Sequence, residues 1–405
     1  MRRSVLVRFL AGVGISGLGD WLTTLALAVV LYGATGSIAA TAGYFLVRVG
    51  PRPLGAWLGG PLGDRISPRV AILAAALAQG ALTAAIAVPL ALGRGLWAVY
   101  LLAGLSQLIG GSWQPLTAAL MARLATGSDR HTLNLADTLL SGGSMLVAPA
   151  IGALLLPVLG AVPLVLTDAA SFLVAAGLFL SLPVMPGGAA RRLNLRGLAL
   201  GGFEAVLPRR ILRIIALGAF SSTVAITALQ TALPALALQR FGASADAGVL
   251  YASVGLGSMG GSFLALWRPI RRPSVILPGL AIEIAGIGGV AVAGSAAADL
   301  VILAISTAAA SLAQIESGVV IQSRPAGTVG RVQGAVSTSR FLGMAGGAAL
   351  ALVLAVTVKS DWETLVLVLA LGGLLVLALS ALGRREPASA ALPLPAISPL
   401  AEFPE

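Results

Sequence analysis

The sequence contains no cysteine and only one histidine. The absence of cysteine excludes disulfides and thiolate metal ligands. His131 cannot form a metal site alone, and it lies in the charged segment "GSDRHT", where we expect it to be solvated. We therefore expect neither a metal nor a cofactor.

Charged residues are also scarce. They make up 10% of the 405 residues, whereas 58% are hydrophobic, and an ordinary soluble domain has roughly 25% charged residues. The apolar runs are long and continuous, which is typical of spanning helices of about 20 residues and not of the short alternating strands of a barrel. The sequence therefore predicts an all-α integral membrane protein.

The net charge of +11 comes mostly from arginine. No polar globular region accompanies these arginines that could carry a nucleic-acid-binding domain. We therefore expect no nucleic-acid partner and assign the basic residues to the membrane surface.

Twelve apolar stretches can be counted along the chain, in two groups of six. They cover residues 9–32, 39–61, 70–92, 95–122, 133–157, 160–182, 211–238, 247–267, 275–295, 297–322, 332–357 and 362–383. We predict a six-helix bundle over 1–182, an inter-half linker over 183–210, a second six-helix bundle over 211–383 and a disordered tail over 384–405.

Arginine is concentrated in every second connection between these stretches. Because basic residues near span ends stay on the cytoplasmic side, both termini, the linker and the tail are predicted to be cytoplasmic. The N-terminus starts like a signal peptide but continues past Asp20 without a cleavage site, so we expect an uncleaved first span. The expected location is the cell inner (cytoplasmic) membrane, with multiple passes.

The segment "GGPLGDRISPRV" after the second span resembles a motif of the major facilitator superfamily, G-x-L-A-D-R-x-G-R-K. The matching residues are Gly60, Leu62, Asp64, Arg65 and Arg69. Gly63 stands for the usual Ala, and Ser67 and Pro68 replace the usual Gly and Arg. The resemblance implies a fold of two six-helix bundles. It also implies that Asp64 closes the cytoplasmic gate by facing the region of Arg331, near the start of the eleventh span.

The fifth span contains "SMLVAPAIGA", which resembles the superfamily's antiporter motif G-x-x-x-G-P-x-x-G-G. Pro149 and Gly152 match, and Ser144, Ala148 and Ala153 are small substitutes. Small residues let helices approach closely, so simple close packing is the alternative interpretation. By resemblance the motif favours efflux.

Three looser patterns resemble the branch of the enterobactin exporter and macrolide efflux proteins: "GDWL", "TDAASF" and "GTVGRVQG". The fourth span, "YLLAGLSQLIGGSWQP", departs from many proton-coupled drug exporters of the superfamily because it has no arginine. Proton coupling through that arginine is therefore not supported.

Charged residues inside the spans are functional candidates, because each costs roughly 2.5–3.5 kcal/mol at the membrane centre. Asp20 lies about 18 Å into the first span at 1.5 Å per residue, and Arg48 reaches a comparable depth in the second. This predicts an ion pair between Asp20 and Arg48. Asp20 could carry a proton when the pair opens, or the pair could only hold two helices together, and the sequence leaves both open.

The other intramembrane charges have less definite roles. Asp137 and Arg340 lie toward the cytoplasm and could close an inner gate, although Arg340 could also extend to the interface. The role of Glu316 is left open. Glu283 and Asp168 are interpreted as structural helix contacts, and Arg52 is also counted among these charges.

By resemblance, spans 1, 4, 7 and 10 should line a central cavity. Their polar or aromatic residues are Trp21, Gln107, Trp113, Gln114, Thr223, Gln230 and Gln314. With little charge among them, the substrate should be a small amphipathic molecule that is neutral or weakly charged.

No nucleotide-binding loop, catalytic triad or intramembrane aspartyl-protease motif is present in the sequence. We therefore predict a monomeric secondary active efflux transporter, not an enzyme. It would export a drug, siderophore or other natural product by alternating access, by proton antiport. The alternatives are a proton-coupled uptake symporter of the same superfamily and a membrane receptor or scaffold that does not transport.

Overall fold

The computed structural model describes residues 2–56, 67–113, 116–117, 120, 129–183, 206–267, 273–322, 326–358 and 361–382. These residues are helical apart from short connections and contain no β-strand. The α-helices are α1 (Arg2–Thr35), α2 (Ile38–Val49), α4 (Pro68–Leu92), α5 (Leu96–Gly111), α7 (Asp129–Leu159), α8 (Ala161–Leu180), α11 (Arg210–Phe241), α12 (Ala247–Trp267), α13 (Ile276–Val292), α14 (Ala296–Gln322), α15 (Ala326–Val353) and α16 (Trp362–Ala381). Short 3-10 turns precede α12 (Ser244–Asp246) and α13 (Pro273–Val275), and a π-turn follows α15 (Leu354–Val358).

Nine helices in the described part of the chain are long and apolar enough to cross a membrane. Two further apolar helices, α5 and α13, are shorter. This agrees with the all-helical membrane class that composition predicts.

Two predicted spans are shorter than expected. The stretch 39–61 does not form one helix: α2 ends at Val49, and residues 52–56 are helical again after Gly50 and Pro51. Proline has no backbone N–H to continue the helical hydrogen bonds, which accounts for the break. The stretch 95–122 is likewise interrupted, because α5 ends at Gly111.

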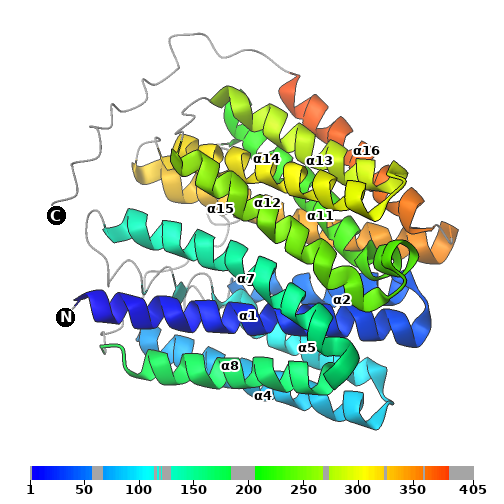
Figure 1. Cartoon of the computed structure of the whole chain (residues 1–405). Coiled ribbons are helices and arrows are strands. Elements are labelled where there is room, and N and C mark those ends of the chain that lie inside the picture. Colours follow the sequence, from blue (N-terminus) through cyan, green and yellow to red (C-terminus); the bar gives the residue numbers. More distant parts are fainter. Residues whose placement is uncertain are drawn as a thin grey trace.

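The helices form two sets (Figure 1). In the first set, α1 packs against α7 and α8, and α4 packs against α5 and α8. In the second, α11 packs against α15 and α16, α12 against α14, and α13 against α14 and α16. The predicted linker and tail lie almost wholly outside the described residues.

The two sets contact each other through α7 on α12 and through α2 on α11 and α15. The Thr41 hydroxyl of α2 donates to the Thr231 carbonyl of α11 at 2.7 Å. On α12, a Cβ added to Gly255 would lie 2.5 Å from the backbone N and Cα of Leu146 in α7. Backbone therefore meets backbone where α7 packs on α12, and α2 forms a second connection between the two sets.

The antiporter-like stretch of α7 lies at this junction. A Cβ on Gly152 would lie 2.8 Å from the Leu25 side chain of α1, and one on Gly248 of α12 would lie 2.2 Å from the Pro149 carbonyl oxygen. The small residues thus let α7 approach both α1 and α12 closely.

Candidate functional site

Asp20 lies in the middle of α1 and forms ion pairs with two arginines. Its Oδ2 is 3.1 Å from Nη2 of Arg48 and 3.5 Å from Nη2 of Arg52. The Asp20 side chain is 28% exposed, whereas that of Arg48 is 10% exposed. The predicted contact between Asp20 and Arg48 is confirmed, and Arg52 adds a second cation.

Gln107 of α5 joins this group of charges. Its Oε1 accepts a hydrogen bond from Nε of Arg52 at 2.7 Å, and its Nε2 donates to Oδ1 of Asp20 at 3.5 Å. The carboxylate is therefore held from α2, from the segment after α2 and from α5. We call Asp20, Arg48, Arg52 and Gln107 the Asp20 network.

Aromatic rings connect the Asp20 network to the second set of helices. The Arg48 guanidinium lies 5.6 Å from the centre of the Trp21 ring, a cation–π geometry. The Trp21 ring in turn packs 5.7 Å from that of Tyr251 in α12. A change in the ion pairs can therefore reach α12 through direct contacts.

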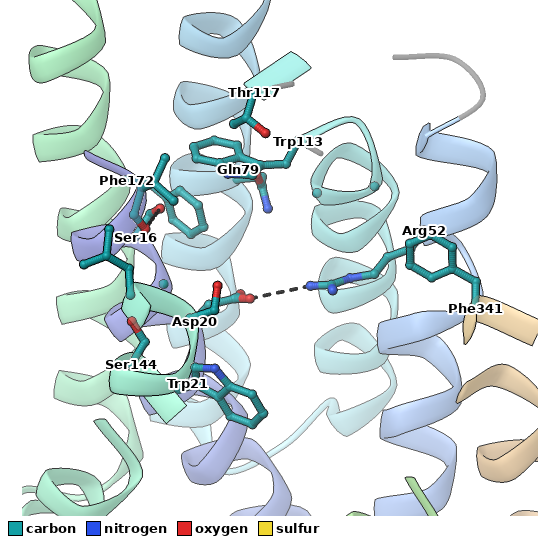
Figure 2. Close-up of a pocket in the computed structure, with 16 residues that line it drawn as sticks. Ser16, Asp20, Trp21, Arg52, Gln79, Trp113, Thr117, Ser144, Phe172 and Phe341 are labelled. Carbon is teal, nitrogen blue, oxygen red and sulfur yellow. Dashed lines mark hydrogen bonds and ion pairs between the residues drawn. The ribbon is translucent and has the colours of Figure 1, made fainter. Parts of the chain in front are cut away.

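A cavity of about 270 Å³ lies beside the network (Figure 2). Asp20 and Arg52 line it, and Figure 2 shows the Arg52 side chain extended toward Asp20, with the Phe341 ring of α15 near it. Other lining residues bring hydroxyl, amide and aromatic groups: Ser16, Trp21, Gln79, Trp113, Thr117, Ser144 and Phe172. The cavity wall presents polar and apolar surface in about equal parts, and placed polar groups are what orient a ligand in a small-molecule site.

The predicted cavity residues are only partly at this cavity. Trp21 and Trp113 line it, and Gln107 lines a neighbouring cavity of about 10 Å³. Gln114 lies outside the described residues.

The three candidates on the second set of helices do not line the 270 Å³ cavity. The Thr223 hydroxyl faces α15 and donates to the Arg340 carbonyl, Gln230 is buried within α11, and Gln314 is exposed on α14. Their place in the wall of a central transport cavity stays a prediction. Span membership alone did not determine which face of each helix they occupy.

Most of the predicted gate motif lies outside the described residues: Gly60, Leu62, Asp64 and Arg65. Arg69 is described, and its guanidinium donates to the Leu180 carbonyl at the end of α8. The side chains of Asp137 and Arg331 are not described. The contact between Asp64 and Arg331 stays a prediction.

Glu283 lies in α13 and Arg340 in α15. The Ser222 hydroxyl of α11 donates to Oε2 of Glu283 at 2.7 Å. Glu283 thus contacts a neighbouring helix, as expected. Glu316 is buried on α14.

The sequence analysis did not single out several residues that line the cavity: Ser16, Gln79, Thr117, Phe172 and Phe341. It counted Arg52 among the intramembrane charges but did not place it beside Asp20. Arg52 follows Arg48 by four positions, the spacing at which side chains share a helix face. That spacing could have linked it to Asp20, although Pro51 interrupts the helix between them.

The fold and site define a multi-pass membrane protein with a polar centre beside a small-molecule-sized cavity. The profile of the Major Facilitator Superfamily matches residues 9–348. The chain belongs to the Major Facilitator Superfamily, and it is a transporter of small molecules and not an enzyme. No curated protein matches it closely enough to be assigned as a relative.

Solved structures of transporters share the fold. One is a POT family transporter in complex with 5-aminolevulinic acid, with 12% identity, a TM-score of 0.71, and coverage of 92% of this chain and 94% of that one. Another is a mutant of the nucleoside transporter NupG, with 14% identity, a TM-score of 0.71 and coverage of 94% and 99%. The human organic anion transporter MFSD10 is 19% identical, with a TM-score of 0.65 and coverage of 94% and 99%. At these identities the likeness shows the fold alone.

Proposed function

We propose that this chain is a secondary active transporter that exports a small amphipathic molecule in exchange for protons. The observation that carries the proposal is the carboxylate of Asp20, which is paired with Arg48 and Arg52 and faces the 270 Å³ cavity. In this proposal twelve spans form two six-helix bundles, 1–182 and 211–383, with the 183–210 linker and both termini on the cytoplasmic side of the inner membrane. The protein works as a monomer.

Proton binding at Asp20 would change a contact that bears on both bundles. Protonation removes the negative charge that attracts Arg48 and Arg52, so it loosens α2 from α1. Because α2 also packs against α11 and α15, weaker attachment to α1 changes the balance between two arrangements of the bundles. A ligand shifts such an equilibrium only by binding the two states differently, and the ion pairs supply that difference for the proton.

The walls of the cavity support an amphipathic substrate. Trp113, Phe172 and Phe341 offer apolar rings, while hydroxyl and amide groups offer hydrogen bonds. A drug, a siderophore or another natural product has this mixed chemistry. The resemblance of "GDWL", "TDAASF" and "GTVGRVQG" to the enterobactin exporter and macrolide efflux branch supports the same class.

The direction of transport is proposed from α7. Its stretch from Ser144 to Ala153 resembles the antiporter motif, and it packs closely on both α1 and α12. That position lets α7 respond to movement of either bundle.

Proton-coupled uptake is the second candidate, and Arg52 is the observation that favours it. Arg52 lines the cavity while it is paired with Asp20. Protonation of Asp20 would free this guanidinium for an anionic substrate, so a proton and an anion would bind together. Such positive linkage is what a symporter requires, whereas a neutral or cationic substrate that competes with the proton fits an antiporter.

The test is solute accumulation in cells with and without the protein, across a panel of drugs and siderophores, with and without an uncoupler. Export predicts that expression lowers accumulation of at least one compound and that the uncoupler abolishes the difference. Raised accumulation would replace export by uptake. An effect that persists with the uncoupler would contradict proton coupling.

A further inference from the structure

We infer that Asp168 is a second proton-carrying residue of this transporter, connected to Asp20 through one water molecule held in the 10 Å³ cavity between α1, α2, α4, α5 and α8. The inference rests on the proposed role of Asp20. It gives a function to a buried carboxyl group that the Asp20 network does not include.

Asp168 lies directly against the residue that precedes Asp20. A Cβ built on Gly19 would lie 2.3 Å from Oδ1 of Asp168 and 2.4 Å from Oγ of Ser171. Only a glycine at position 19 permits this approach of α8 to α1. Because Gly19 has no side chain, the Asp168 carboxyl of α8 can lie against α1 at the residue next to Asp20.

The direct partner of the Asp168 carboxyl is a hydroxyl group and not a cation. The Ser171 hydroxyl donates to the Asp168 carbonyl at 2.7 Å and lies 3.3 Å from its Oδ1. None of the ion pairs found in the described part of the chain includes Asp168. The charged and titratable groups that act on it are Asp20 from α1 and Arg48 and Tyr44 from α2, where Arg48 is already paired with Asp20.

Burial makes the neutral form of such a group favourable. Asp168 is 1% exposed, and an ionised carboxylate without a paired cation is far more costly to bury than a neutral carboxylic acid. While Asp20 is ionised and holds Arg48, Asp168 therefore keeps its proton. If Asp20 becomes neutral, Arg48 becomes available as a cation for an ionised Asp168.

The small cavity connects the two carboxyl groups. Its lining includes Asp20, Thr23, Thr83, Ser106, Gln107 and Asp168. The Thr23 hydroxyl oxygen is buried and lies beside the Asp168 carboxyl at the edge of this cavity. One water molecule needs a cavity of about 10–15 Å³ and two to four polar partners. This cavity offers both.

The proposed transfer conserves charge. The water gives a proton to the Asp20 carboxylate and receives the proton of Asp168, so one carboxyl becomes neutral as the other becomes ionised. The reverse transfer restores the first state. Asp20 faces the cavity, so it exchanges protons with the transport path, and Asp168 stores the proton away from it.

The test is infrared spectroscopy of the purified full chain in lipid bilayers at neutral pH, following the carbonyl stretch of protonated carboxylic acids. The wild type should show this band, and Asp168→Asn should remove one component of it. Asp20→Asn should weaken or abolish that component, because a neutral residue 20 leaves Arg48 available to pair with an ionised Asp168. Glu283→Gln is the control, since Glu283 lies in another helix set, and it should leave the component in place.

Thr23→Val gives a second readout that keeps both carboxyl groups. Loss of the hydroxyl removes a polar group that lies beside both Asp168 and the water site, and it should shift the Asp168 component in a protein that retains Asp168. An unchanged carboxylic acid region in both Asp168→Asn and Thr23→Val would overturn the inference. Transport is not part of this readout, so failure of the proposed function, seen as proton-independent transport, is a separate result from absence of the Asp168 band.

Discussion

Asp20 and Arg48 form an ion pair that joins the middle of α1 to α2, with 3.1 Å between Oδ2 and Nη2. The pair lies within the membrane-spanning region and shares its carboxylate with Arg52. Because α2 also packs on α11 and α15, the pair connects a titratable group to the contact between the two sets of helices. This relationship is the basis of the transport mechanism that we propose.

Replacing Arg48 should destabilise the protein measurably. Arg48→Gln leaves Asp20 with Arg52 alone and removes the cation–π contact with Trp21. Removing one partner of a buried pair costs about 3–5 kcal/mol, and we expect a value at or below about 3 kcal/mol because Asp20 is 28% exposed. Thermal unfolding in detergent would measure the change. Arg94→Gln, at an exposed connection, is the control and should stay within about 0.5 kcal/mol.

A double variant measures how much the Asp20 and Arg48 side chains stabilise each other. Asp20→Asn combined with Arg48→Gln should recover part of the loss, with a coupling of about 0.5–3 kcal/mol. Strictly additive losses would mean that the two side chains do not stabilise each other.

A methyl group at Gly255 should shift the balance between transport states. Gly255→Ala places a Cβ 2.5 Å from the Leu146 backbone, which cannot move aside as a flexible side chain can. We expect α7 and α12 to separate, and the distance between spin labels at Ala34→Cys and Ala243→Cys to increase. The chain has no native cysteine, so these two sites can be labelled selectively.

Gly260 lies on the same helix, and a Cβ added there would have no neighbouring atom within 4 Å. Gly260→Ala should therefore leave the distance between the two spin labels unchanged. Equal distances in Gly255→Ala and the wild type would show that the α7–α12 contact does not hold this state.

The stability of α16 should depend on pH through Asp361. This carboxylate caps the helix by accepting a hydrogen bond from the Thr364 N–H at 2.9 Å, which lowers the pKa of Asp361 below its usual value. A lowered folded-state pKa means that the stabilisation is present above the unfolded value of about 3.9 and is lost as pH falls through the folded value.

Asp361→Ala should therefore lower stability by about 1 kcal/mol or less near neutral pH, with the difference from the wild type shrinking below about pH 4. Asp361→Asn keeps a neutral cap and should show neither the loss nor the pH dependence. Apparent melting temperatures measured from neutral to acidic pH check both. A loss in Asp361→Ala that stays constant down to acidic pH would contradict the role of the ionised carboxylate.

Much of the helical fold could be predicted from the sequence because the length of an apolar run is a property of a single segment. The long helices α1, α4, α7 and α11 fall where hydrophobic runs predict them. The end of α2 at Val49 was not predicted, because a Pro within an apolar run can either bend a helix or break it.

The site was predictable where depth alone decides a contact. The sequence places Asp20 and Arg48 at comparable depth on consecutive helices, and they are paired. Contacts that depend on helix rotation were not predictable: Thr223 faces α15 and not the cavity, and Asp168 lies against Gly19. A sequence without a known helix arrangement does not specify which faces meet.

In the proposed mechanism, Asp20 couples proton movement to transport. The direct measurement uses purified protein in proteoliposomes with a substrate found by the cell panel, and it follows transport under an imposed pH gradient. We predict that the wild type moves the substrate against its concentration gradient at the expense of the pH gradient, and that Asp20→Asn retains binding but loses this response. Transport by Asp20→Asn that still follows the pH gradient at the wild-type rate would contradict the account.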